Sequence, residues 1–131
     1  MGKIIEMTDD EIFSRLMDEK SMPERTLVIK RLNIPVTIKA LNWKELVKID
    51  ERCTVTIDGK KVRDVEKYNA AIVVAATVRP NWGDPKLTSA LKLSSGEEVV
   101  KRRLTAGEFS MLSDAVLDLS GFGDGIEEVK N

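Results

Sequence analysis

The chain has 131 residues, of which 42% are hydrophobic and 33% are charged. A typical domain holds roughly 100–200 residues, so this length and apolar content predict one folded domain and exclude a disordered chain. Lys and Arg number 21 against 22 Asp and Glu, giving a net charge of −1. This balance argues against a strongly basic nucleic-acid-binding protein.

The sequence contains no His and one Cys, Cys53. It therefore excludes Ser–His–Asp triads, His-containing zinc sites and intramolecular disulfides, which fits a reducing cytoplasm. Cys53 lies on the apolar side of a predicted helix, which favours a buried and inert thiol. The acidic residues are sequence neighbours in capping turns and on solvent faces, unlike a catalytic pair that faces across a cleft. We predict a non-enzymatic protein without a cofactor or metal.

The N-terminal part predicts one helix followed by a β-hairpin. Thr8 and Glu11 form a capping box, and Ser21-Met22-Pro23 ends the helix. Two runs rich in β-branched residues follow at 26–32 and 35–41, and Asn33-Ile34 between them marks the turn. The apolar stripe of the helix comprises Ile12, Phe13, Leu16 and Met17.

The middle of the chain predicts two further helices around a tight turn. Asn42 and Glu45 form a second capping box. Residues 54–57 then run into Asp58-Gly59, a strong tight-turn signal. Residues 64–78 are apolar on most faces, which predicts a central, buried helix. The helix that starts after Asn42 has an apolar side made of Trp43, Leu46, Val47, Ile49 and Cys53.

The C-terminal part predicts a helical turn within 87–93, a short helix at 97–103 and a last helix capped by Thr105 and Glu108. Ser120-Gly121 ends the last helix. We therefore expect a single α+β domain over residues 1–121, with a small antiparallel β-hairpin packed with about four or five helices. Residues 122–131 are expected to form a mobile tail.

Two binding functions remain open from the residues alone. Residues 21–63 hold ten cationic against five acidic residues, Lys30 and Lys39 among the cations. The basic segment 25–63 therefore suits a small nucleic-acid-binding regulatory protein. Few aromatic residues interleave with these cations, so a base-stacking surface is poorly supported. A protein-interaction module is the other reading. Apolar residues in the tail either anchor a partner or pack back on the domain: Phe122, Ile126 and Val129.

Several short segments, taken in their order, resemble the XkdN-like phage tail assembly chaperones of contractile-tailed phages and prophages of Gram-positive bacteria. The resemblance covers nearly the whole chain. Its segments are the strand pair 26–41 running into Asn42-Trp43-Lys44-Glu45, then Tyr68-Asn69-Ala70-Ala71-Ile72-Val73, Val78-Arg79-Pro80-Asn81-Trp82, Asp84-Pro85-Lys86-Leu87 and Leu119-Ser120-Gly121-Phe122.

The resemblance implies a chaperone that binds the tape measure protein and tail tube subunits in the host cytoplasm and is absent from the mature virion. Self-association is left open, and no membrane or nucleic-acid partner is expected. The resemblance supplies no catalytic residue. As candidate partner-binding residues we take Trp43, Trp82, Phe122, Ile126, Val129, Lys30 and Lys39.

The resemblance also implies a longer product made by ribosomal frameshifting near the 3′ end of the gene. The segment Val129-Lys130-Asn131 can be encoded GUA-AAA-AAC, which contains a slippery run. Synonymous codons would break that run, so the amino-acid sequence permits the frameshift without showing it.

Overall fold

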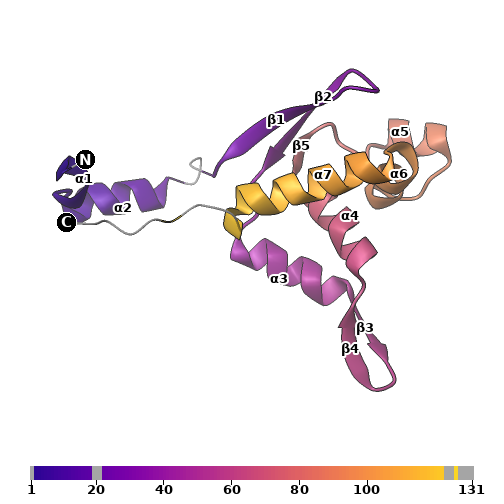
Figure 1. The fold of residues 1–131 in the computed structure, drawn as a ribbon, viewed down its shortest axis with the longest axis horizontal. Helices are drawn as coiled ribbons and strands as arrows, with labels where there is room; N and C mark the ends of the chain where they lie inside the picture. The colour runs from indigo at the N-terminus through magenta and orange to yellow at the C-terminus, as the bar shows by residue number, and fades with distance from the viewer. Residues whose placement is uncertain (1, 19–21, 123–125, 127–131) are drawn as a thin grey trace.

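The structure is a computed structural model that describes residues 2–18, 22–122 and 126. It is an α+β fold, as predicted (Figure 1). The strands are β1 (Glu24–Ile29), β2 (Ile34–Lys39), β3 (Thr54–Ile57), β4 (Lys60–Arg63) and β5 (Thr77–Arg79). The helices are α1 (Gly2–Ile5), α2 (Asp9–Met17), α3 (Trp43–Arg52), α4 (Val65–Ala76), α5 (Pro85–Leu91), α6 (Gly96–Arg103), α7 (Ala106–Leu117) and the short η2 (Asp118–Phe122).

The predicted hairpin forms the β1–β2 part of a three-stranded antiparallel sheet with strand order β1-β2-β5. Val36 and Ile38 point into the core and are fully buried, as the alternating pattern predicted. The first strand ends earlier than expected, at Ile29. The amide of Asn33 donates to the carbonyl of Ile29 over 2.8 Å, and Asn33 takes φ 54°, a left-handed conformation that Asn tolerates. Residues 30–33 are therefore the turn.

The third strand of the sheet corrects one prediction. The central helix was expected to continue to residue 78, but α4 ends at Ala76 and Thr77–Arg79 form β5. Thr77 pairs with Ile38, and Arg79 pairs with Thr37. Tertiary pairing with β2 thus overrides the helical pattern at Thr77 and Val78, both of which are β-branched residues that suit a strand.

Helix α4 is the centre of the fold, as predicted. It packs against α3, α6, α7 and β2, and five of its residues are buried: Ala70, Ala71, Ile72, Val73 and Ala76. The capping boxes of α3 and α7 are both present, at Asn42 with Glu45 and at Thr105 with Glu108. The region expected to hold a helical turn forms α5, which Asp84 caps with Pro85 in its first turn.

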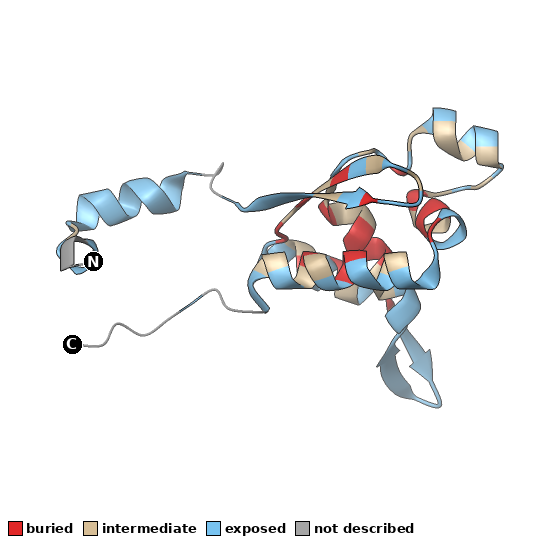
Figure 2. Ribbon diagram, turned by 45° about the horizontal axis from the view of Figure 1, so that its top comes forward, coloured by how far each residue is buried: buried red, intermediate tan, exposed pale blue. Residues whose placement is uncertain are grey.

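Two parts of the chain project from this core, one to the left and one downward in Figure 1. One is α2, which ends at Met17, before the expected Ser21-Met22-Pro23, and contributes no buried residue. The other is the β3–β4 hairpin, in which all residues but Thr54 are exposed. Both are coloured as exposed in Figure 2, whereas the buried residues gather in the body between them.

The predicted tail falls only partly within the described residues. Phe122 is the last residue of η2, but Gly121 takes φ 98°, so the helical backbone breaks at Gly121, where the sequence predicted the end of the last helix. Residues 123–125 and 127–131, including Val129, lie outside the described part of the chain. Among the described helices, none is both long and apolar enough to cross a membrane.

Candidate protein-binding groove

Helix α3 carries two apolar lines, of which only one enters the core. Leu46, Ile49 and Cys53 are buried. Trp43 and Val47, one helical turn apart, lie on a neighbouring line and are 78% and 36% exposed. The sequence predicted a single apolar side for this helix, and the structure divides that side into a buried line and an exposed one. The second line is therefore free to contact another molecule.

The exposed line of α3 forms one wall of an open groove with a volume of ≈ 400 Å³. Helices α4 and α7, the end of β4 and η2 supply the remaining lining. The lining residues are Trp43, Leu46, Val47, Asp50, Arg63, Tyr68, Leu117 and Phe122. Phe122 is 67% exposed, so the groove presents two largely exposed aromatic rings from segments that are distant in sequence.

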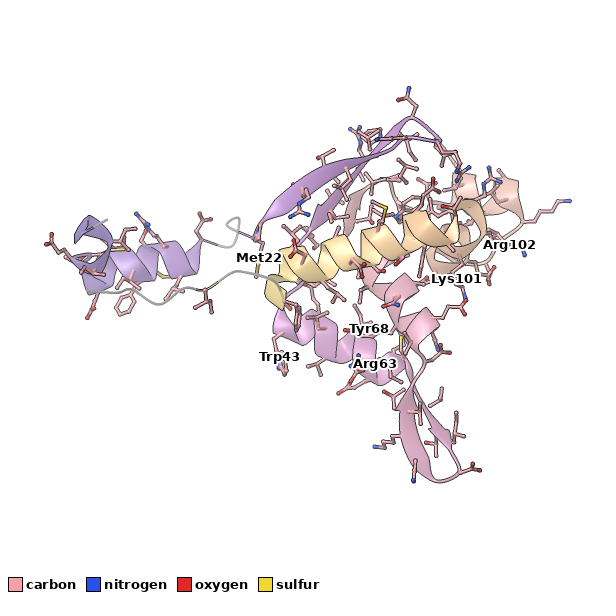
Figure 3. The ribbon with its side chains drawn as sticks, viewed as in Figure 1. Met22, Trp43, Arg63, Tyr68, Lys101 and Arg102 are labelled. Atoms are coloured by element: carbon pink, nitrogen blue, oxygen red, sulfur yellow. The ribbon has the colours of Figure 1, made fainter. Side chains whose placement is uncertain are left out.

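A polar cluster of Asp50, Arg63 and Tyr68 lines the groove at the end away from Trp43 (Figure 3). The Nε of Arg63 donates to Oδ1 of Asp50 over 2.6 Å, and the guanidinium lies over the Tyr68 ring, 4.2 Å from its centroid. This hydrogen bond to the Asp50 carboxylate raises the pKa of Arg63 above its ordinary value. Figure 3 shows Arg63 and Tyr68 together, with Trp43 at the opposite end of α3. The groove thus combines an apolar wall with an edge where the charges of Arg63 and Asp50 are paired.

A second cleft, also ≈ 400 Å³, is lined mostly by charged residues of α3, α4 and α6. Its charged side chains form ion pairs across it: Arg52 with Glu97 at 3.9 Å and Lys101 with Glu66 at 3.4 Å. Hydrogen bonds from Ser94 hold the pKa of Glu98 below its ordinary value. Glu98 therefore stays ionised near neutral pH, the opposite of what a general acid requires.

The structure separates the candidate residues that the sequence proposed. Trp43 and Phe122 line the groove, and Ile126 is 95% exposed. Trp82 is only 5% exposed, and its Nε1 donates to Oγ1 of Thr77 over 3.0 Å, so its ring is part of the core. Lys30 and Lys39 lie at the two ends of the β1–β2 hairpin and do not line the groove.

The basic segment does not present its cations as one bare surface. Four of its arginines are paired with carboxylates, in the pairs Arg25–Asp118, Arg31–Glu108, Arg52–Glu97 and Arg63–Asp50. The two hairpins of this segment project in different directions (Figure 1). Phosphate binding along a nucleic acid needs several unpaired cations on one face, and this arrangement does not favour it.

Among the groove residues, sequence reasoning proposed only Trp43 and Phe122 as binding residues. It took Tyr68 as part of the buried central helix and did not single out Leu117. The signal available in the sequence was the doubled apolar pattern of α3. Residues 46, 49 and 53 form a complete core stripe without Trp43. A Trp beside that stripe is not needed for packing of the core. The sequence did not show that residues of α7 and η2 would line the same groove as Trp43.

The family model for the phage XkdN-like tail assembly chaperone protein matches residues 13–131. The chain therefore belongs to this family of tail assembly chaperones. It is 27% identical over 103 residues to protein YqbN of Bacillus subtilis (strain 168), covering 74% of this chain and 69% of that protein.

The chain is also 24% identical over 103 residues to the phage-like element PBSX protein XkdN of Bacillus subtilis (strain 168), covering 74% of this chain and 70% of that protein. A crystal structure of YqbN has the same fold, with a TM-score of 0.63 and 22% identity. The superposition covers 83% of this chain and 95% of that one. The resemblance seen in the sequence is thus confirmed.

Proposed function

We propose that this tail assembly chaperone binds the tape measure protein and tail tube subunits without catalysing a reaction, and that the groove beside α3 holds an apolar helix of the tape measure protein. A long helical protein with an exposed apolar stripe aggregates unless that stripe is covered. A groove with an apolar wall and aromatic residues suits such a helix.

One observation carries the proposal. Trp43 and Phe122 belong to segments that resemble the family, and both rings stay largely exposed in the same groove. Other residues of those segments serve the fold: Asn42 caps α3, and Trp82 is buried. Large aromatic side chains at the centre of an interface commonly supply most of the binding energy. Trp43 and Phe122 are therefore the expected anchors.

The test is co-expression of the chain with helical fragments of the tape measure protein encoded in the same genome. The wild-type chain is expected to keep such a fragment soluble, and Trp43→Ala or Phe122→Ala to weaken binding by roughly 30-fold. Met111→Ala is the matched control, because Met111 is 74% exposed on α7 outside the groove. Equal binding by W43A, F122A and the wild type would contradict the groove assignment.

Tryptophan fluorescence gives an independent measurement. The chain has two Trp residues, and only Trp43 is exposed. Binding of a helix over Trp43 should shift its emission to shorter wavelength, while buried Trp82 acts as an internal reference. A Trp43→Phe variant should lose the shift and keep most of the affinity. A shift that persists in this variant would place the client away from the groove.

The longer frameshift product stays a proposal of the same kind. Expression of the gene with its native downstream DNA, followed by mass spectrometry, should give a minor, heavier protein with the same N-terminus. Recoding Lys130 with a synonymous codon should abolish the heavier product if slippage occurs there. A heavier product that survives recoding would rule out slippage at this site.

A further inference from the structure

Helix α2 presents an apolar face that stays largely exposed and contributes no buried residue. Its stripe of Ile12, Phe13, Leu16 and Met17 is 40–77% exposed. The side chains follow the i, i+1, i+4, i+5 spacing of one helix face. The first turn holds Asp9, Asp10 and Glu11, and Arg15 is the only cation in the helix, so α2 is both amphipathic and acidic.

The β3–β4 hairpin presents the complementary surface. Val55 lies directly opposite Val62, and Ile57 opposite Lys60, so these four side chains share one face of the hairpin. The three apolar side chains are 40–55% exposed. The hairpin carries Lys60, Lys61 and Arg63 against Asp58 in its turn, and is therefore basic. A two-stranded hairpin is marginally stable alone in water, so a contact on this apolar face would stabilise it.

We propose that α2 of one copy of the chain docks on the apolar face of the β3–β4 hairpin of a second copy. The charges are complementary, because an acidic helix meets a basic hairpin. The two surfaces lie far apart in both views (Figures 1 and 2). A second copy brings them together without any rearrangement of the core, since neither surface contributes to it.

This contact is head-to-tail, because each copy uses two different surfaces. Such contacts repeat and produce a ring or an open array, unlike a two-fold dimer. A nine-residue helix on a short hairpin buries less than the roughly 1,200 Å² of a standard specific interface. We therefore expect weak association that rises with concentration. The groove beside α3 takes no part in it, so the association does not depend on the proposed client.

Sedimentation velocity of the full chain alone tests the contact. The average mass should rise with protein concentration and continue past two copies. A helix variant, Phe13→Ser with Leu16→Ser, and a hairpin variant, Val55→Thr with Val62→Thr, should each weaken association by at least about 30-fold. The threonines keep the β-branched shape that suits a strand. Far-UV circular dichroism should show the fold intact in both.

Mixing the two variants decides the arrangement. The helix variant retains a good hairpin, and the hairpin variant retains a good helix, so their mixture should form a 1:1 complex that neither forms alone. An α2–α2 dimer would be lost in the helix variant only and would not return on mixing. If α2 instead docked in the groove beside α3, the hairpin variant would associate as strongly as the wild type. Either of these results, or a wild-type chain that stays monomeric throughout, would overturn the proposal.

A charge reversal adds a matched control. Lys60 shares the apolar face of the hairpin, whereas Lys61 lies on the opposite face. Lys60→Glu should weaken association by about 3- to 10-fold, and Lys61→Glu should have little effect at the same net charge. Asp10→Lys should weaken the wild type and restore part of the affinity of the Lys60→Glu variant. Equal effects of the two lysine variants would reject a face-specific contact.

Discussion

Arg31 and Glu108 lie 77 residues apart in the sequence and meet through two parallel hydrogen bonds, Nη2 to Oε1 at 2.9 Å and Nε to Oε2 at 3.1 Å. The same Nη2 donates to the carbonyl of Arg103 over 2.7 Å. Oε1 of Glu108 also accepts from the amide of Thr105 over 2.8 Å in the α7 capping box. One carboxylate thus caps α7 and fixes the β1–β2 turn against it.

Acid should weaken this link. Hydrogen bonds from Arg31 first, and from the amide of Thr105, lower the pKa of Glu108 from 4.5 to about 2. Because the folded pKa is depressed, the ionised carboxylate stabilises the folded state. Its contribution is complete above pH 4.5 and is lost as the pH falls toward 2. Thermal unfolding between pH 5 and pH 2.5 should show a steeper loss of Tm for the wild type than for Glu108→Gln. Parallel curves would contradict this role.

Gly96 is required where α6 begins against the loop that carries Trp82. A Cβ at this position would lie 3.0 Å from the amide nitrogen of Gly83 and 3.2 Å from the Cβ of Trp82. Because backbone atoms are involved, Gly96→Ala should destabilise the fold by about 1–3 kcal/mol in urea unfolding.

Gly107 provides the control for Gly96. It also lies in the first turn of a helix, and nothing is within 4 Å of its added Cβ. Gly107→Ala should be neutral or stabilise by up to about 1 kcal/mol, because Ala is the better helix former. Equal destabilisation by both substitutions would show that the contact with Trp82 is not the cause.

Ser120 connects the end of α7 to the segment between β2 and α3. Its hydroxyl donates to the carbonyl of Val116 over 2.7 Å and accepts from the amide of Leu41 over 2.9 Å. Leu41 is buried, so Ser120→Ala leaves this amide without its partner and should cost about 1–3 kcal/mol. Ser110→Ala, at an exposed position of α7, should change the unfolding free energy by less than about 0.5 kcal/mol. Similar values for the two variants would argue against the connection.

Ile72 tests the central position of α4. It is fully buried, and Ile72→Ala should cost about 2–5 kcal/mol of unfolding free energy because a cavity remains. Val65→Ala in the same helix is the control, since Val65 is 63% exposed and should lose well under 1 kcal/mol. A small effect of Ile72→Ala on the unfolding free energy would contradict a central position of α4 in the core.

The sequence by itself determined the local structure. Each of these features depends on residues that are neighbours in the sequence: the capping boxes at Asn42 and Thr105, the turn at Asp58-Gly59 and the buried helix α4. All of them formed, although α4 ends two residues earlier than predicted. The family resemblance was readable for the same reason, because short segments in a fixed order carried it.

Tertiary structure decided what depends on distant neighbours. Thr77 and Val78 continue a helical pattern, yet β2 lies beside them and draws them into a strand. Trp43 and Trp82 both follow Asn in the sequence, but one is exposed and the other buried. Their roles differ because Trp82 packs in the core, whereas Trp43 lies at the start of α3, outside the core cluster. Exposure is a property of the packed molecule, so the sequence alone could not place Trp43 and Phe122 in one groove.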